Sequence, residues 1–126
     1  MLLLGVGCVA LTMSLLLVCV DVASLALRRR EAVLTADTAA RAAAQALDVR
    51  AYYTAAPNGR LPLDPALARS RAAAAIQPPW RLESVDVVAG EVTVTVGTRV
   101  DFAGGSSLGL PSTWVHGTSA AVLRRP

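Results

Sequence analysis

The chain has 126 residues and a formal net charge of +3, with 12 basic residues that are all Arg and 9 acidic residues. The basic residues are spread along the sequence without an aromatic-and-basic patch, which argues against nucleic-acid binding. No acid–base pair, nucleophile arrangement or metal-ligand cluster is visible in the sequence, so we expect no enzyme, no metal or cofactor site and no small-molecule substrate.

Residues 1–27 are the predicted transmembrane segment. Residues 2–20 are apolar apart from Thr12 and Ser14, whose hydroxyls can bond back to the helix. At 1.5 Å per residue this stretch is about 28 Å long, close to the thickness of a bilayer core. Asp21 is the only charged side chain of the segment. We expect it at the water interface, with a neighbouring subunit's cation as the alternative partner.

The segment could also be a signal peptide, with Ser24-Leu25-Ala26 as the cleavage site. Two features argue against cleavage. No Lys or Arg precedes residue 28, and the apolar stretch exceeds the usual length of about 7–15 residues. The helical pattern also continues beyond Ala26. We therefore expect the segment to be retained, and a secreted protein that begins near Leu27 stays as an alternative.

Residues 28–56 are predicted to form an alanine-rich helical extension, because neither Gly nor Pro interrupts residues 28–51. Glu31 lies three residues after Arg28, and Asp37 lies four residues before Arg41, so both pairs can meet on the helix surface. One apolar stripe recurs at spacings of three and four: Val33, Ala36, Ala40, Ala44 and Leu47. Most of its side chains are methyl groups, which favours close approach of another backbone.

Residues 57–126 are predicted to form a small α+β domain. Pro57-Asn58-Gly59 is a turn signal, and Asp64 before Pro65 is typical of a helix start. The predicted elements are a helix at about 65–76 and strands at about 81–89, 91–102 and 113–123. Ala89-Gly90 is expected to be a tight turn between the first two strands. His116 is expected to be a strand residue with a structural hydrogen bond.

The predicted fold class is therefore α+β. A long N-terminal helix leads from the membrane into the periplasm, a short helix follows, and a small three-stranded antiparallel sheet packs on the first helix. Three strands need a cover for their apolar face. The apolar stripe of the helical extension is the expected cover.

This order of elements resembles that of a pilin. Residues 15–48 in particular resemble the N-terminal signature of TadE/TadG-like proteins of the tight-adherence pilus system. In that family an apolar segment ends in an aspartate, a basic cluster follows, and a second aspartate opens an alanine-rich helix. Asp21, the arginines at 28–30 and Asp37 match these positions. The positions five beyond Gly5 and Gly7 are Ala10 and Thr12 rather than the glutamate common in the family, so prepilin-peptidase cleavage is not expected.

The resemblance implies a non-enzymatic, single-pass minor pilin or pseudopilin with its soluble domain outside the cytoplasm. Its partners would be the membrane and other pilus subunits, which it would contact through the N-terminal helix. Small side chains permit close helix packing in lipid. The candidate interaction residues are Gly5, Gly7, Ala10, Ser14, Asp21, Asp37 and Arg41. For Asp37, an ordinary pair with Arg41 is the alternative to a subunit contact.

The orientation in the membrane stays open at this point. Arg28, Arg29 and Arg30 directly follow the apolar segment, and the positive-inside rule would keep that side in the cytoplasm. That orientation is opposite to the one the family resemblance implies. A single-pass accessory subunit with a cytoplasmic domain is therefore a further alternative. A basic leader upstream of residue 1 would restore the pilin-like orientation.

Overall fold

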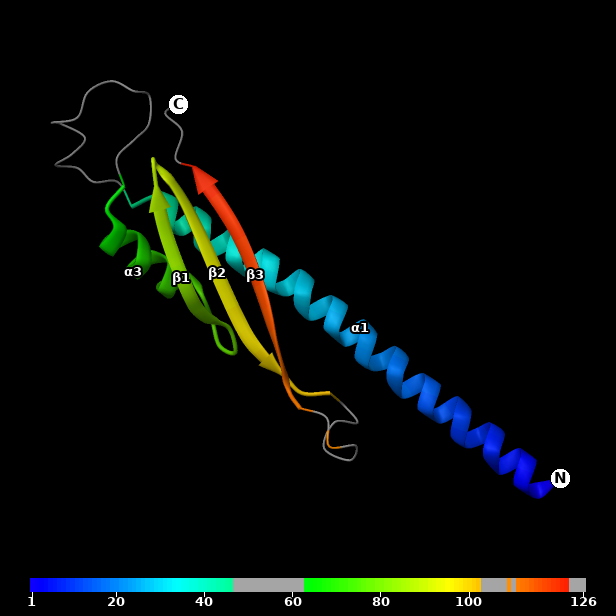
Figure 1. Ribbon diagram of the computed structural model, residues 1–126. Coiled ribbons are helices and arrows are strands. Elements are labelled where there is room, and N and C mark those ends of the chain that lie inside the picture. Colours follow the sequence, from blue (N-terminus) through cyan, green and yellow to red (C-terminus); the bar gives the residue numbers. More distant parts are fainter. Residues whose placement is uncertain (47–62, 103–108, 110, 123–126) are drawn as a thin grey trace, which may run out of the picture.

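The computed structural model describes residues 1–46, 63–102, 109 and 111–122. The elements are α1 (Leu2–Ala44), α3 (Pro65–Ala75), β1 (Arg81–Val88), β2 (Glu91–Val100) and β3 (Thr113–Val122). The three strands form one antiparallel sheet in the order β1-β2-β3. The sheet packs along the C-terminal half of α1, and the N-terminal half extends alone beyond the domain (Figure 1). This architecture confirms the predicted α+β fold class.

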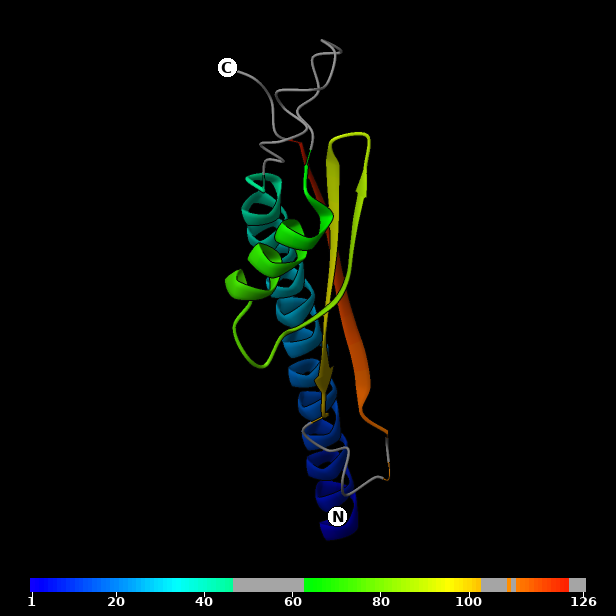
Figure 2. The same cartoon turned by 90° about the vertical axis from the view of Figure 1, so that its left-hand side faces the viewer.

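The core lies between α1 and the sheet, with α3 against α1 and β1 (Figure 2). On the sheet side, the largest fully buried side chains are Val92, Val94 and Val96 of the central strand. On the helix side the buried residues are all alanines: Ala32, Ala36, Ala39, Ala40, Ala43 and Ala44. The helix therefore contributes a smooth surface of methyl groups, and the valines of β2 supply most of the apolar volume.

The predicted helical stripe is partly confirmed and partly wrong. Ala36, Ala40 and Ala44 are buried as expected, but Val33 is 50% exposed. The buried stripe begins instead at Ala32 because the sheet comes so close to the helix that only a methyl group fits beneath it. Leu47, the last predicted member, lies outside the described residues.

The helix ends at Ala44, earlier than the predicted extension through residue 56. Residues 45 and 46 have already left the helix, and residues 47–56 lie outside the described part of the chain. Contacts from α3 account for this end. Arg71 Nη1 donates to the Gln45 carbonyl at 3.0 Å, and the Asp64 amide donates to the Ala46 carbonyl at 3.0 Å. Tertiary hydrogen bonds thus take over carbonyls near the helix terminus.

The start of α3 follows the prediction. Asp64 is the N-cap residue, and its side chain accepts hydrogen bonds from the amides of Ala66 and Leu67 while Pro65 occupies the first turn. The predicted turn at residues 57–59 lies outside the described residues.

Gly117 marks the closest approach of the sheet to α1. A Cβ atom built on Gly117 would lie 2.4 Å from the carbonyl carbon of Ala32 and 2.5 Å from its oxygen. These are backbone atoms of a packed helix, so they cannot move aside as a flexible side chain does. A glycine is therefore required where β3 crosses α1.

A β-bulge explains the imperfect alternation of β1. Leu82 pairs with Val96 and Ser84 pairs with Thr95, so Glu83 is an extra residue in the ladder. Residues three apart in a regular strand point to opposite faces. Because the bulge adds one residue between them, Leu82 and Val85 both pack against the core. The predicted strand is thus confirmed, and its irregular pattern has a structural cause.

The predicted tight turn is also confirmed. Val88 pairs with Glu91, and the two residues between them have positive φ angles, 51° at Ala89 and 81° at Gly90. Positive φ at both central positions is the signature of a type I′ hairpin turn. Glycine adopts this conformation freely, whereas the Cβ atom of Ala89 makes it unfavourable.

Replacing Gly117 with Ala should lower the free energy of unfolding by about 1–3 kcal/mol, because the new methyl group forces β3 away from α1. Gly97→Ala is the matched control, since its Cβ would meet side-chain atoms of the half-exposed Glu83–His116 pair rather than helix backbone. We expect the control to cost less than about 1 kcal/mol. Thermal unfolding of the full chain in detergent, followed by circular dichroism, compares the two variants. Equal losses would contradict the close helix–sheet contact.

Replacing Ala89 with Asn should raise the free energy of unfolding by about 0.5–1 kcal/mol, because Asn tolerates the left-handed conformation that Ala resists. The same measurement checks this expectation. Ala120→Asn, at an exposed position in the extended backbone of β3, should instead be neutral or destabilising. A lower melting temperature for Ala89→Asn would contradict the turn type.

Candidate assembly surface on α1

The N-terminal half of α1 is an uncovered apolar rod. Every residue from Leu2 to Val20 is exposed, and Leu11, Met13 and Leu15 each expose between 66% and 72% of their surface. Exposing apolar surface to water costs a free energy of about 25 cal/mol for each Å². Among the described residues, α1 is the one helix long and apolar enough to cross a membrane.

The predicted small residues of this rod do not share one face. A shallow, open hollow of 600 Å³ on the helix surface has Gly5 and Ala10 on its two sides, and Gly7 and Ser14 lie outside it; its lining is Leu2, Gly5, Val6, Val9, Ala10 and Met13. Two residues along a helix correspond to a rotation of about 200°, so Gly5 and Gly7 face nearly opposite directions. Ala10 and Ser14 lie within about 60° of Gly7, so Gly5 is on one side of the rod and the other three small residues share another.

The two hydroxyls of the rod bond to its own backbone, as predicted. Thr12 Oγ1 donates to the Cys8 carbonyl at 2.7 Å, and Ser14 Oγ donates to the Ala10 carbonyl at 2.9 Å. Both polar groups are thus satisfied without water. A Cβ atom added at Gly5 or Gly7 would meet nothing within 4 Å, so the fold of the single chain does not require either glycine.

Asp21 lies where the rod meets the folded domain. It is the first residue after the exposed stretch to be partly covered, and Leu25, one turn later, packs against the core. The aspartate therefore coincides with a structural boundary, and beyond it the helix is increasingly covered by its own domain.

Asp37 and Arg41 belong to the covered half of α1. Asp37 Oδ2 lies 2.9 Å from Arg41 Nη2, which confirms the predicted pair within the helix. Asp37 Oδ1 also accepts a hydrogen bond from Ser119 Oγ of β3 at 3.2 Å. Asp37 thus links the helix to the sheet. This contact was not foreseen, and its only signal in the sequence is a small polar residue at an inward-facing position of β3.

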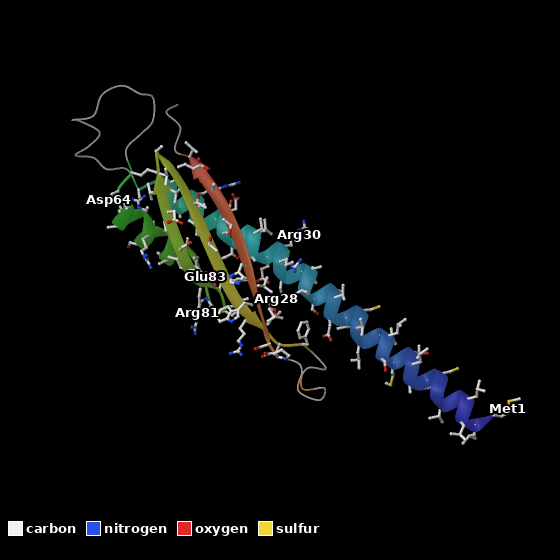
Figure 3. All side chains as sticks on the ribbon, in the orientation of Figure 1. Met1, Arg28, Arg30, Asp64, Arg81 and Glu83 are labelled. Carbon is white, nitrogen blue, oxygen red and sulfur yellow. The ribbon has the colours of Figure 1, made fainter. Side chains whose placement is uncertain are left out.

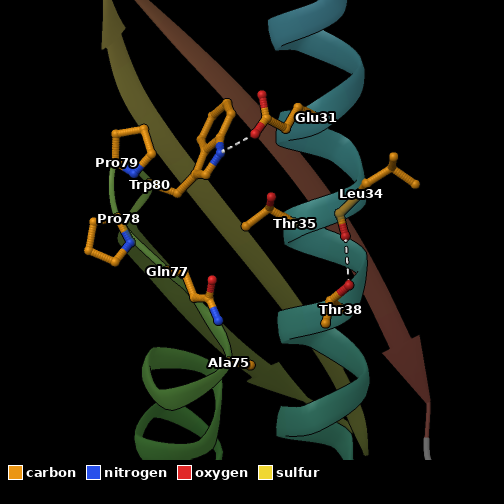
Figure 4. Close-up of a pocket in the computed structure, with 9 residues that line it drawn as sticks. All are labelled: Glu31, Leu34, Thr35, Thr38, Ala75, Gln77, Pro78, Pro79 and Trp80. Atoms are coloured by element: carbon orange, nitrogen blue, oxygen red, sulfur yellow. Dashed lines mark hydrogen bonds between the residues drawn. The ribbon is translucent and has the colours of Figure 1, made fainter.

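A shallow hollow of 310 Å³ separates α1 from the segment that follows α3 (Figure 4). Trp80 lies at its edge, and its Nε1 donates to Glu31 Oε1 at 3.4 Å. Glu31 also pairs with Arg28 at 3.1 Å, as the spacing predicts. Its carboxylate thus links α1 to the segment that follows α3.

The single histidine lies on β3, where His116 Nδ1 is 2.8 Å from Glu83 Oε2 across the central strand. Gly97 lies between them, and a Cβ at that position would collide with the Glu83 carboxylate. The predicted structural hydrogen bond is confirmed. Within the described residues, no group of three or more His, Cys, Asp or Glu side chains could hold a metal ion.

Comparison with family models, with curated proteins and with solved structures gives no match to this chain.

Proposed function

We propose that this chain is a non-enzymatic, single-pass membrane subunit of the pilin type. The exposed half of α1 would lie in the bilayer and pack with the helices of other subunits in a pilus or a related secretion apparatus. One observation carries the proposal: a single helix of 43 residues has an entirely uncovered apolar half and a second half covered by its own sheet. Such a division suits a helix that holds its domain at one end and enters lipid or a helical bundle at the other.

The resemblance to TadE/TadG-like proteins gives the proposal its specific form. Asp21 and the arginines at 28–30 mark the end of the rod, and Asp37 lies within the part of the helix that the sheet covers. Asp37 supports the fold through Ser119 and Arg41, so its role in the proposal is to hold the domain on the helix. Asp21 and the small residues of the rod stay the proposed contacts with other subunits.

The packing of Leu25 supports the retention of the apolar N-terminal segment in the mature chain. This side chain packs against the core of the domain, and α1 continues without a break through Ala26. Cleavage after Ala26 would remove Leu25 and split the helix just where the domain begins to cover it. A retained anchor is thus the better fit to the packing than a secreted domain.

The proposed orientation places the sheet domain outside the cytoplasm. The arginine cluster favours the opposite arrangement by the positive-inside rule, so an accessory subunit with a cytoplasmic domain is the second candidate. External protease added to intact spheroplasts separates the two. Digestion of the domain without lysis supports the pilin-like orientation, and protection until lysis supports the second candidate.

Packing of the rod against other helices predicts a selective effect of bulky substitutions. Gly7→Leu should reduce several-fold the amount of chain in high-mass complexes from the host membrane, because the added side chain keeps helices apart. The fold of the single chain should be unaffected, since nothing lies within 4 Å of the new Cβ. Native gel electrophoresis of detergent extracts measures the complexes.

Ala23→Leu is the matched control, because Ala23 is also small and exposed but lies outside the proposed set. It should keep the complexes. Gly5→Leu tests the opposite side of the rod in the same way. Undiminished complexes in both glycine variants would refute assembly through these positions.

A further inference from the structure

A groove lies at the junction of the rod and the domain, between α1 and β3. Its volume is 490 Å³, and its walls carry Leu25, Arg29 and Val33 of α1 together with Phe102 and residues 113–116. Its chemistry differs from that of the hollow at Trp80, because it combines aromatic rings, aliphatic side chains and a guanidinium group.

The position of this groove along α1 is defined by the apolar rod. Its helix wall begins at Leu25, five residues beyond Val20, where the uninterrupted exposed stretch of α1 ends. Five residues of helix are about 7.5 Å. The end of β2 and the start of β3 are the parts of the sheet nearest to the rod (Figures 1 and 2). If the rod spans a bilayer, the groove opens at the level of the lipid headgroups.

The aromatic side chains at this end of the sheet are unusually exposed for their size. Trp114 is 50% exposed, whereas Trp80 is 7% exposed and belongs to the core. The rings of Trp114 and His116 stack with their centroids 6.4 Å apart, and Phe102 lines the same groove. Tryptophan is enriched at membrane–water interfaces because its ring is apolar and its N–H is polar.

Basic groups gather at the same level. Figure 3 shows Arg28 and Arg30 along the same part of α1, with Arg30 on the side turned away from the sheet, and Arg81 on the β1 side of the sheet; Arg99 pairs in register with Trp114. Four acidic residues lie near this level: Glu31 is paired with Arg28 and Glu83 with His116, while Asp21 precedes Leu25 by one turn and the exposed Asp101 precedes Phe102. Among the described residues, Arg29 makes no ion pair with an acidic side chain. A guanidinium in the groove beside an exposed tryptophan suits a phosphate group.

We propose that this groove seats the headgroup of an anionic phospholipid, with Arg29 on the phosphate and Trp114 and Phe102 at the glycerol level of the bilayer. The inference rests on the proposed membrane anchoring and adds a second point of contact. The helix alone would leave the domain free to tilt and rotate over the surface. Contact at the edge of the sheet would fix the orientation of the domain relative to the membrane.

The test uses the full chain in lipid nanodiscs that contain phosphatidylcholine brominated near the headgroup. Bromine quenches tryptophan fluorescence on contact. Emission should be strongly quenched in the wild-type chain, and the quenching should be largely lost in Trp114→Phe, because Trp80 is buried. Trp80→Phe should keep the quenching. The two variants together assign the quenching to Trp114, and a folding defect in one variant would not reproduce this contrast.

A second arm tests the phosphate contact with brominated phosphatidylglycerol as the minor lipid in a phosphatidylcholine disc. The fraction of phosphatidylglycerol needed for half-maximal quenching should rise about fivefold in Arg29→Gln, the effect of one interfacial cation. Arg69→Gln is the matched control, because Arg69 is exposed on α3 and does not line the groove. It should leave the titration unchanged.

The outcomes separate the inference from the anchoring on which it rests. A chain that inserts into discs but shows no quenching of Trp114 overturns the inference and leaves the anchoring intact. Quenching that depends on the number of chains per disc would assign the groove to a second copy and also overturn the inference. A chain that fails to insert at all overturns both. Equal phosphatidylglycerol titrations for Arg29→Gln and Arg69→Gln would contradict the proposed contact between Arg29 and the phosphate.

Discussion

The structure depends on how closely α1 approaches the sheet. Alanines on the helix face the valines of β2, and Gly117 removes the one side chain that would separate β3 from the backbone of Ala32. A chain of this size has little apolar volume to bury, so a short distance between layers compensates for small side chains. Larger residues on the helix would add area to the core, but they would also hold the sheet away. The alanines at the buried positions of α1 between residues 32 and 44 are thus a packing requirement.

The same constraint accounts for the division of α1 into two halves. Where the sheet covers the helix, the buried side chains are methyl groups. Where the sheet ends, the helix carries large apolar side chains that nothing in the described structure covers. The change occurs around Asp21 and Leu25, at the level of the groove beside Trp114. Anchoring, assembly and contact with the lipid surface are therefore proposals about one continuous helix whose composition changes once along its length.

Much of this fold could be predicted from the sequence because the signals are local. Asp64-Pro65 starts α3, Ala89-Gly90 forms the hairpin turn, and alternating valines define β2. The phase of the helical stripe could not be predicted, because Val33 and Ala32 both fit a helical repeat and only the approach of Gly117 decides between them. The end of α1 depends on hydrogen bonds from Asp64 and Arg71, which periodicity cannot reveal. For the candidate surface, the sequence locates the apolar rod, and residue spacing places Gly5 and Gly7 on nearly opposite sides of it. The contact of Asp37 with Ser119 of β3 could not be predicted, because it depends on how the sheet lies on the helix.

The central claim is that the apolar half of α1 stays attached to the domain as a membrane anchor. The most direct measurement is the intact mass of the chain in each fraction of the host cell, with the membranes washed in alkaline carbonate. The account predicts a carbonate-resistant membrane protein that retains residues 2–20, near 13.0 kDa if the chain is unprocessed. A soluble product that begins at Leu27 would contradict it, because the rod would then be a signal peptide.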